Sequence, residues 1–213
     1  MRILDKHTPP DPRFADEDGL VGLGGTLAPD YLLAAYRAGA FPWSSRPVLN
    51  WWSPDPRMIF DLATFRPHRS VLKSARRAGW RFSVDGDFGG VIRACAGREE
   101  TWISADFIAA YTRLHRLGHA HSVEVYEGEE LVGGLYGVSV GAFFGGESMF
   151  SRRADASKAA LGFLVERLRA GGFSLFDAQA PTPHLARLGA SPVPRAEYLS
   201  RLRSAVAAPA SLG

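Results

Sequence analysis

The chain has 213 residues, of which 46% are hydrophobic and 22% are charged, and its formal net charge is +3. This composition is ordinary for a soluble globular protein. No apolar run approaches the roughly 20 residues that a membrane-spanning helix needs. The single cysteine, Cys95, excludes an intramolecular disulfide and is typical of a cytoplasmic protein. A net charge of +3 is too small to indicate a polyanionic partner by itself.

The first third of the sequence predicts short elements interrupted by glycine and proline. A helix is expected after Pro29 and Asp30, and it should end near Gly39. Pro54 and Pro56 exclude a helix before residues 58–62, which are predicted to form a strand. These elements can form a small N-terminal α+β unit, although no clear linker separates it from the rest.

A basic segment, "RPHRSVLKSARR", covers residues 66–77. At helical spacing its apolar residues form one stripe, and the positive charges lie mainly on another face. The positive charges are those of Arg66, Arg69, Lys73, Arg76 and Arg77, and helical spacing places Arg69, Lys73 and Arg77 on one face. A solvated surface helix and a phosphate-binding helix both remain possible at this point.

The remaining sequence has a clearer pattern. Helices are predicted at 88–97, 104–118, 157–172, 183–189 and 195–205, strands at 80–88 and 173–180, and an antiparallel meander between 121 and 150. Ser104 is a candidate N-cap, and Gly118 is expected to stop the same helix. The order of these elements is a helix, antiparallel strands, a helix and a strand. This order predicts an α+β fold in which helices cover a largely antiparallel sheet.

Polar residues at strand ends are the candidates for chemistry. Asp177 and Gln179 in "FSLFDAQA" are two apart, so strand alternation places them on one side and Phe176 on the other unless a bulge intervenes. A carboxylate beside an amide can hold an attacking or leaving group, but two polar residues bonded to a turn would have the same pattern. Glu147 is similarly ambiguous, because a strand-edge carboxylate is usually solvated or paired with a nearby arginine.

Several familiar motifs can be excluded. Gly118 separates the neighbouring histidines 115 and 119, and neither an HExxH motif nor paired cysteines accompany them, so no metal site is expected. "GVSVG" has the letters of a nucleophile elbow, but it lies in the predicted meander and not at a strand-to-helix turn. Neither a P-loop nor a GxGxxG fingerprint is present.

A set of longer motifs carries a resemblance over nearly the whole chain, from about Gly19 to Leu202. These motifs are "GLVGLGGTLAPDYLLAAYRAGAFPW", "WWSPDPR", "TWIS", "YTRLHRLGHAHSVEV", "LVGGLYGV", "GGESMFSR", "ASKAAL", "FDAQ" and "HLARLGA". In this order they resemble the bacterial leucyl/phenylalanyl-tRNA–protein transferases.

The resemblance implies a small N-terminal domain at residues 1–62 and an acetyltransferase-like (GNAT-like) catalytic domain at 63–213. It implies transfer of leucine or phenylalanine, and of methionine more weakly, from aminoacyl-tRNA to the α-amino group of proteins that begin with arginine or lysine. The product would be marked for degradation through the N-end rule pathway. Because the ester to tRNA is already activated, no cofactor and no metal are expected. The partners would be aminoacyl-tRNA and the acceptor protein, and the enzyme would be a cytoplasmic monomer without membrane contact.

The resemblance also implies roles for individual positions. Asp177 and Gln179 would be the catalytic pair, and Glu147 would bind the basic acceptor residue. The donor side chain would enter a pocket of Leu135, Met149, Leu161, Leu164, Leu168 and Phe176. The adenosine and the tRNA would be bound by Trp51, Trp52, Trp102 and the basic helix with Arg69, Lys73, Arg76 and Arg77. For the tryptophans, core packing is the alternative.

Two other functions remain open from sequence. An acyl-CoA-dependent N-acetyltransferase would share the implied fold, but it needs a glycine-rich turn for the pyrophosphate, and "SRRAD" before the helix at 157–172 has no glycine. A non-catalytic RNA-binding protein would use the basic helix and the tryptophans. That interpretation leaves Glu147, Asp177 and Gln179 without a task.

Overall fold

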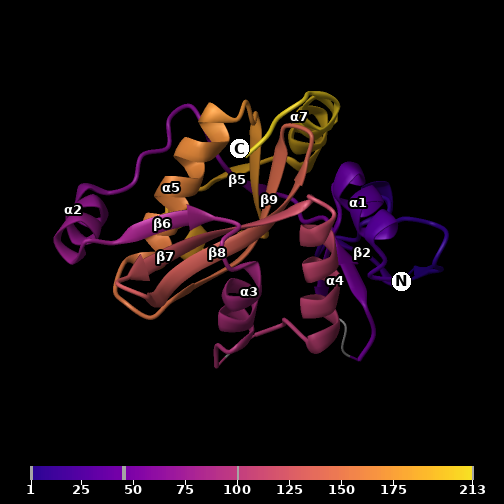
Figure 1. Cartoon of the computed structure of the whole chain (residues 1–213). Coiled ribbons are helices and arrows are strands. Elements are labelled where there is room, and N and C mark those ends of the chain that lie inside the picture. Colours follow the sequence, from indigo (N-terminus) through magenta and orange to yellow (C-terminus); the bar gives the residue numbers. More distant parts are fainter. Residues whose placement is uncertain (1, 45–46, 100, 213) are drawn as a thin grey trace.

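The computed structural model describes residues 2–44, 47–99 and 101–212, and its strands form two sheets (Figure 1). The smaller sheet has the order β1-β2-β4-β3. Its strands are β1 (Ile3–Leu4), β2 (Leu20–Gly24), β3 (Phe41–Ser44) and β4 (Asn50–Trp52). A 3-10 turn, η1 (Pro12–Phe14), and helix α1 (Pro29–Ala38) complete this N-terminal part. Helix α1 ends as predicted, because Gly39 adopts a left-handed φ of 96°.

The larger sheet has seven strands in the order β11-β5-β10-β9-β8-β7-β6. These are β5 (Arg57–Phe60), β6 (Arg81–Val84), β7 (Ala120–Glu127), β8 (Glu130–Val140), β9 (Phe143–Ser151), β10 (Leu175–Gln179) and β11 (Ser191–Val193). Strands β7, β8 and β9 form the predicted meander. All neighbouring pairs are antiparallel except β9 and β10, which run parallel.

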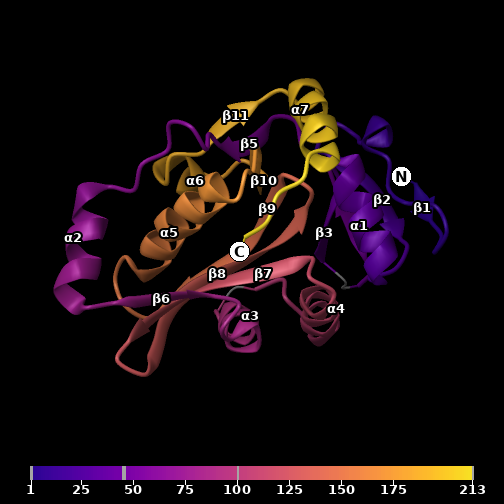
Figure 2. The same cartoon turned by 45° about the horizontal axis from the view of Figure 1, so that its top comes forward.

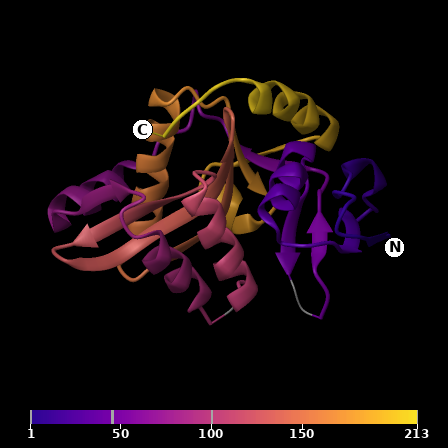
Figure 3. The same cartoon turned by 45° about the vertical axis from the view of Figure 1, so that its right-hand side comes forward.

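The helices of the larger part cover both faces of this sheet (Figures 1 and 2). They are α2 (Arg69–Ala78), α3 (Phe88–Ala96), α4 (Ala105–Arg116), α5 (Ala156–Ala170), α6 (Pro183–Arg187) and α7 (Arg195–Ala207). Helix α5 packs on strands β7 to β9, with α2 beside it, whereas α3 and α4 pack on the opposite face. Figure 3 shows α7 above the N-terminal part, where it contacts α1.

Helices α3 and α4 begin at capping residues. The Ser104 hydroxyl accepts a hydrogen bond from the Phe107 amide, and the Asp87 carboxylate caps α3 through the Gly90 amide at 2.8 Å. The predicted α+β order is therefore confirmed as a mixed fold with two mostly antiparallel sheets. Sequence reasoning missed strands β1 to β4 and β11, which have two to five residues each and little alternation.

The two parts of the chain are tied together by packing. One hydrophobic cluster joins α1, β3 and β4 to α3, α4 and α7, and a second fills the α5 face of the larger sheet. Strand β5 hydrogen-bonds between β10 and β11 in the larger sheet, although it precedes residue 62. Division of the chain at residues 62 and 63 stays a proposal. Among the described residues, no helix has the length and apolar character needed to cross a bilayer.

Candidate active site

A cavity of about 280 Å³ opens where β9 and β10 separate. The parallel pairing of these strands runs from Leu175 and Phe143 to Asp177 and Gly145 and is not continued beyond. Past this point the two strands supply opposing walls, including Glu147 on β9 and Gln179 on β10. The cavity is lined by residues of both hydrophobic clusters, so it reaches from one face of the sheet to the other. We call it the split-sheet cavity.

Each wall carries a β-bulge beside the cavity. The β8–β9 register shifts between the pairs Tyr136–Ser148 and Gly137–Gly146, which leaves Glu147 unpaired. The β10–β5 register shifts between Asp177 and Gln179, and Gln179 has a φ of 67°. A bulge re-aims side chains and ends regular pairing. The two bulges therefore bring Glu147 and Gln179 together across the split, with Gln179 Nε2 donating to Glu147 Oε1 at 2.8 Å.

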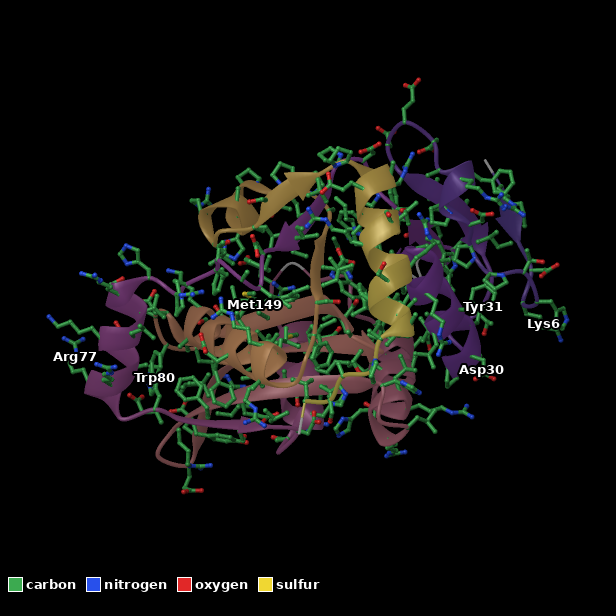
Figure 4. All side chains as sticks on the ribbon, turned by 90° about the horizontal axis from the view of Figure 1, so that it is seen from above. Lys6, Asp30, Tyr31, Arg77, Trp80 and Met149 are labelled. Carbon is green, nitrogen blue, oxygen red and sulfur yellow. The ribbon has the colours of Figure 1, made fainter. Side chains whose placement is uncertain are left out.

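The apolar end of the cavity lies on the α5 side. Of the predicted donor pocket, Leu135, Met149, Leu161 and Phe176 line the cavity. Leu164 and Leu168 do not line it; they lie one and two turns beyond Leu161 on α5 and are buried in the adjoining core. Figure 4 shows Met149 in the interior of the molecule, well away from Arg77 and from Asp30.

The polar end is built around the buried side chain of Glu147, which is 9% exposed. Tyr36 donates to Glu147 Oε1 at 2.8 Å and Tyr111 donates to Oε2 at 3.1 Å. The two tyrosine hydroxyls also lie 2.5 Å from each other. When Glu147 is ionised, the two tyrosine hydroxyls have two protons for three contacts, namely one from each hydroxyl to the carboxylate and one between the hydroxyls. A proton on the carboxyl group would supply the third.

The pKa of Glu147 follows from this environment. Burial raises it most, the hydrogen bonds from Tyr36 and Tyr111 oppose the rise, the negative charge of Asp177 adds to it, and the result is a pKa of about 7. Burial also raises the pKa of both tyrosines well above the usual value, so their hydroxyls stay protonated donors. Glu147 can thus change charge near neutral pH.

Asp177 lies behind the cavity and does not line it. Arg57 binds it in a fork, with Nε 2.8 Å from Oδ1 and Nη2 2.6 Å from Oδ2, and both side chains are 1% exposed. Tyr198 donates to Oδ2 at 3.0 Å, and the Gln179 amide donates to Oδ1 at 2.8 Å. Burial alone would lower the pKa of Arg57, but the charge of Asp177 reverses this and raises it overall. The four donors occupy the carboxylate, so Asp177 positions Gln179 and has no acceptor site left for a substrate.

Simple strand alternation was therefore wrong for this segment. It predicted Asp177 and Gln179 on one side and Phe176 on the other, whereas Phe176, Ala178 and Gln179 all line the cavity and Asp177 does not. The bulge is the physical reason. A non-glycine residue at positive φ costs about 1–2 kcal/mol, and the bond from the Gln179 amide to Asp177 holds that conformation.

The predicted tryptophans have different places. Trp51 is fully buried and its indole donates to the Gly24 carbonyl at 2.9 Å, so core packing describes it and no ring face is open to a base. Trp102 lines the cavity. Trp43, which sequence reasoning missed, also lines it and is 40% exposed, and Trp52 supports it from behind with ring centroids 5.6 Å apart.

The basic helix stands apart from the cavity. Arg69, Lys73, Arg76 and Arg77 are exposed, and none forms an ion pair with another described residue. Figure 4 shows Arg77 projecting from the end of the molecule. Val71 anchors the helix as its buried residue, and α2 packs on α5.

Other residues of the site were not found from sequence, namely Arg57, Tyr36, Tyr111, Tyr198 and Trp43. Arg57 stands in "WWSPDPR" and Trp43 in "FPW", so both belong to the motifs behind the resemblance, but pattern alone gave them no role. Among the described residues, no group of three or more histidine, cysteine, aspartate or glutamate side chains could hold a metal ion.

Comparison with known proteins gives consistent results. A family model described as leucyl/phenylalanyl-tRNA protein transferase matches residues 59–203, and one described as the N-terminal domain of the same family matches residues 25–55. A leucyl/phenylalanyl-tRNA–protein transferase of Shewanella denitrificans is 52% identical over 89% of this chain and 82% of its own. One of Anaeromyxobacter sp. is 50% identical over 96% and 90%. The solved structure of L-PGS from Bacillus licheniformis matches with 16% identity, coverage of 62% and 48%, and a TM-score of 0.45, which is too low to support an argument.

Proposed function

This chain belongs to the leucyl/phenylalanyl-tRNA protein transferase family, and we propose on that premise that it transfers leucine or phenylalanine, and methionine more weakly, from aminoacyl-tRNA to proteins that begin with arginine or lysine. The observation that carries the proposal is the split-sheet cavity. It is apolar at one end and has Glu147 and Gln179 at the other. One cavity can thus receive an apolar donor side chain and a cationic acceptor together.

The donor side chain would lie against Leu135, Met149, Leu161 and Phe176. The cavity of about 280 Å³ is small for a ligand site, and its apolar end is only a part of that volume. Hydrophobic pockets separate side chains that differ by one methylene by only about 1–3 kcal/mol. Met149 has a flexible thioether, so it can repack to admit either an isobutyl or a benzyl group.

The acceptor would place its basic side chain near Glu147. A carboxylate has about four acceptor positions, and Tyr36, Tyr111 and Gln179 use three of them. One position is therefore left for an N–H of arginine or lysine. Because the pKa of Glu147 is about 7, the carboxylate is largely charged above neutral pH, where it attracts the cation.

In the reaction, the neutral α-amine attacks the ester carbonyl carbon, a C–N bond forms, and the C–O bond to the ribose breaks. The proton lost by the amine ends on the ribose oxygen, either directly or through neighbouring groups. An ionised Glu147 can only accept hydrogen bonds, so it fixes Gln179 with Nε2 toward itself. Gln179 Oε1 makes no hydrogen bond within the described chain and can accept from the attacking amine. Asp177 and Arg57 hold this arrangement from behind.

The terminal adenosine would stack on Trp43 and Trp102, the two tryptophans that line the cavity. The exposed charges of α2 would contact the tRNA backbone and not its sequence. We also propose a GNAT-like fold for the larger part, in agreement with its helix–meander–helix–strand order. A cytoplasmic monomer acting in the N-end rule pathway completes the proposal.

An acyl-CoA-dependent acetyltransferase is the rival. That chemistry uses a helix N-terminus with open amides to bind pyrophosphate. Here Asp155 stands at the N-cap of α5 and pairs with Lys158 at 2.8 Å. The preceding residues 151–155 contain no glycine, so the start of α5 lacks the glycine-rich turn that would present open amides to a pyrophosphate. A non-catalytic RNA-binding protein, the third candidate, would have no use for the Glu147–Gln179 contact inside a cavity.

A donor-exchange assay tests the proposal. The purified protein is given labelled leucyl-tRNA, labelled phenylalanyl-tRNA or labelled acetyl-CoA, each with a peptide that begins with arginine and one that begins with alanine. We expect label only from the two aminoacyl-tRNAs and only on the arginine peptide. Labelling from acetyl-CoA, or equal labelling of both peptides, would contradict it.

A further inference from the structure

A second pocket, of about 440 Å³, adjoins the split-sheet cavity, and we call it the basic pocket. Its polar lining consists of Arg66, His68, Ser70, Lys158, His184 and Arg187. Neither aspartate nor glutamate lines it within the described part of the chain. A hollow lined by several cationic groups and no carboxylate fits a phosphate-bearing ligand.

Three segments far apart in sequence build this pocket. They are the connection from β5 to α2 with the first turn of α2, the first turns of α5, and helix α6. Figure 2 shows α6 beside α5, and the connection from β5 arching over toward α2. Leu161 and His184 line both the basic pocket and the split-sheet cavity. The two spaces are therefore neighbours, and the basic pocket lies on the side toward α2.

The positive charge of the pocket is only partly neutralised. Arg187 is exposed and makes no hydrogen bond or ion pair with another described residue. The Arg66 guanidinium donates to two backbone carbonyls, those of Ala63 and Phe65, which leaves its charge uncompensated. Lys158 pairs with Asp155, but both side chains are partly exposed and such a pair is weak.

We propose that the basic pocket binds the backbone of the unpaired nucleotides that precede the terminal adenosine of the donor tRNA. This rests on the function proposed above. A strand that leaves an adenosine at the rim of the split-sheet cavity and continues to α2 must cross the space between them. The basic pocket occupies that space, and His184 stands at the junction.

The acceptor peptide is a poor occupant for this pocket. Its first residue is cationic under the proposed function, so the lining would repel it. A single RNA strand carries one negative phosphate per nucleotide and is bound by cationic side chains along its backbone. The alternative path for the strand passes Arg98, which also lines the cavity and whose Nη2 donates to Ser148.

Donors of increasing length test the proposal. Leucyl-adenosine, leucyl-CpCpA and leucyl-tRNA are compared with the arginine peptide as acceptor, using the native chain, R187Q and R66Q. We expect each variant to lower kcat/KM about threefold to tenfold for the two longer donors and less than about twofold for leucyl-adenosine. For leucyl-CpCpA, the slope of log kcat/KM against log salt should fall by about 0.7 in each variant.

The matched control is R116Q, which removes an exposed arginine on α4 that lines neither space. R116Q should change kcat/KM by the same factor for all three donors. Three results would overturn the basic pocket as the binding site. They are a loss of kcat/KM with leucyl-adenosine as large as with the longer donors, an effect of R116Q as large as that of R187Q, and no loss with any donor. A length-dependent loss in R98Q and not in R187Q would instead assign the strand to the other rim. If the native chain uses neither leucyl-tRNA nor phenylalanyl-tRNA, the proposed function itself fails.

If leucyl-adenosine is too slow a donor for comparison, inhibition gives the same answer. Unacylated CpCpA and free adenosine are tested as competitors of leucyl-tRNA. We expect R187Q to weaken inhibition by CpCpA about threefold or more and to leave inhibition by adenosine unchanged. Equal weakening of both inhibitors, or of neither, would contradict the proposal.

Discussion

Two buried carboxylates, Glu147 on β9 and Asp177 on β10, lie on either side of the split in the sheet and differ in their partners. Asp177 has a buried cation, Arg57, in a forked ion pair. Glu147 is surrounded by neutral donors, and its pKa is raised to about 7. Burial alone therefore does not determine the role of a carboxylate. A permanent cation makes Asp177 a fixed structural group, whereas its absence lets Glu147 respond to pH and to an incoming cation.

Removal of the cation should have the largest effect. R57M leaves Asp177 buried without compensation, and we expect the free energy of unfolding to fall by about 3–5 kcal/mol in urea titrations. R201M is the matched control, because Arg201 forms an exposed pair with Glu197, and it should change stability by less than about 1 kcal/mol. The double variant R57M/D177N should be more stable than R57M. A loss no larger than that of the control would show that the ion pair does not distinguish Asp177.

The second prediction concerns stability and pH. Glu147 has a pKa of about 7 in the folded chain, raised from an ordinary value of 4.5, so its contribution to stability is fully present below pH 4.5 and is lost as pH rises through 7. Between pH 5 and pH 8 the native chain should therefore lose about 2–3 kcal/mol more than E147Q does. Urea titrations of both proteins at the two pH values measure this. If the free energy of unfolding changed by the same amount in both proteins between pH 5 and pH 8, Glu147 would keep one charge state over this range.

Gln179 touches both carboxylates, so its removal tests whether they act together. Q179A should lower kcat about tenfold to a hundredfold at saturating donor and acceptor, because the attacking amine loses the group that orients it. D177N should lower kcat by a smaller factor, since Asp177 acts through the Gln179 backbone. S148A changes another cavity residue and should leave kcat within about twofold. An unchanged kcat in both Q179A and D177N would remove the pair from catalysis.

The smallest expected effect is a shift in the pH profile. Acceptor KM should fall as pH rises through about 7, because Glu147 gains the charge that attracts the basic side chain. The hydrogen bond from Tyr111 lowers the pKa of Glu147, so Y111F should move this midpoint to higher pH. E147Q should abolish it, which separates it from titration of the peptide amine. A midpoint that is the same in Y111F and the native chain would contradict the role given to the tyrosine.

Much of the fold could be read from the sequence. Helix α4 has a local N-cap in Ser104, and helix α1 has a local stop in Gly39. The β7–β9 meander has alternating polar and apolar residues separated by turns. Each of these elements is therefore determined by residues close together in the sequence. The resemblance placed Glu147 and Gln179 in a site, and the structure brings them into contact. It also named Leu164 and Leu168, which do not line the cavity because they face the core one and two turns beyond Leu161.

Other features depend on residues distant in sequence. Arg57 and Asp177 are 120 positions apart, and Tyr36 and Glu147 are 111 apart, so no window of sequence contains either contact. The bulge at Gln179 breaks the alternation on which the orientation of Asp177 was predicted. The choice among tryptophans was also tertiary: Trp51 fills the core and Trp43 lines the cavity.

Residues close together in the sequence were enough to predict most of the helices and the β7–β9 meander, and the motifs place this chain in its family. Hydrophobic period, caps and turn residues act over a few positions, so they leave a local record. The tertiary structure was needed to show that Asp177 pairs with a buried cation and that Glu147 faces the cavity. Those roles depend on dielectric environment and on partners that meet after the chain folds.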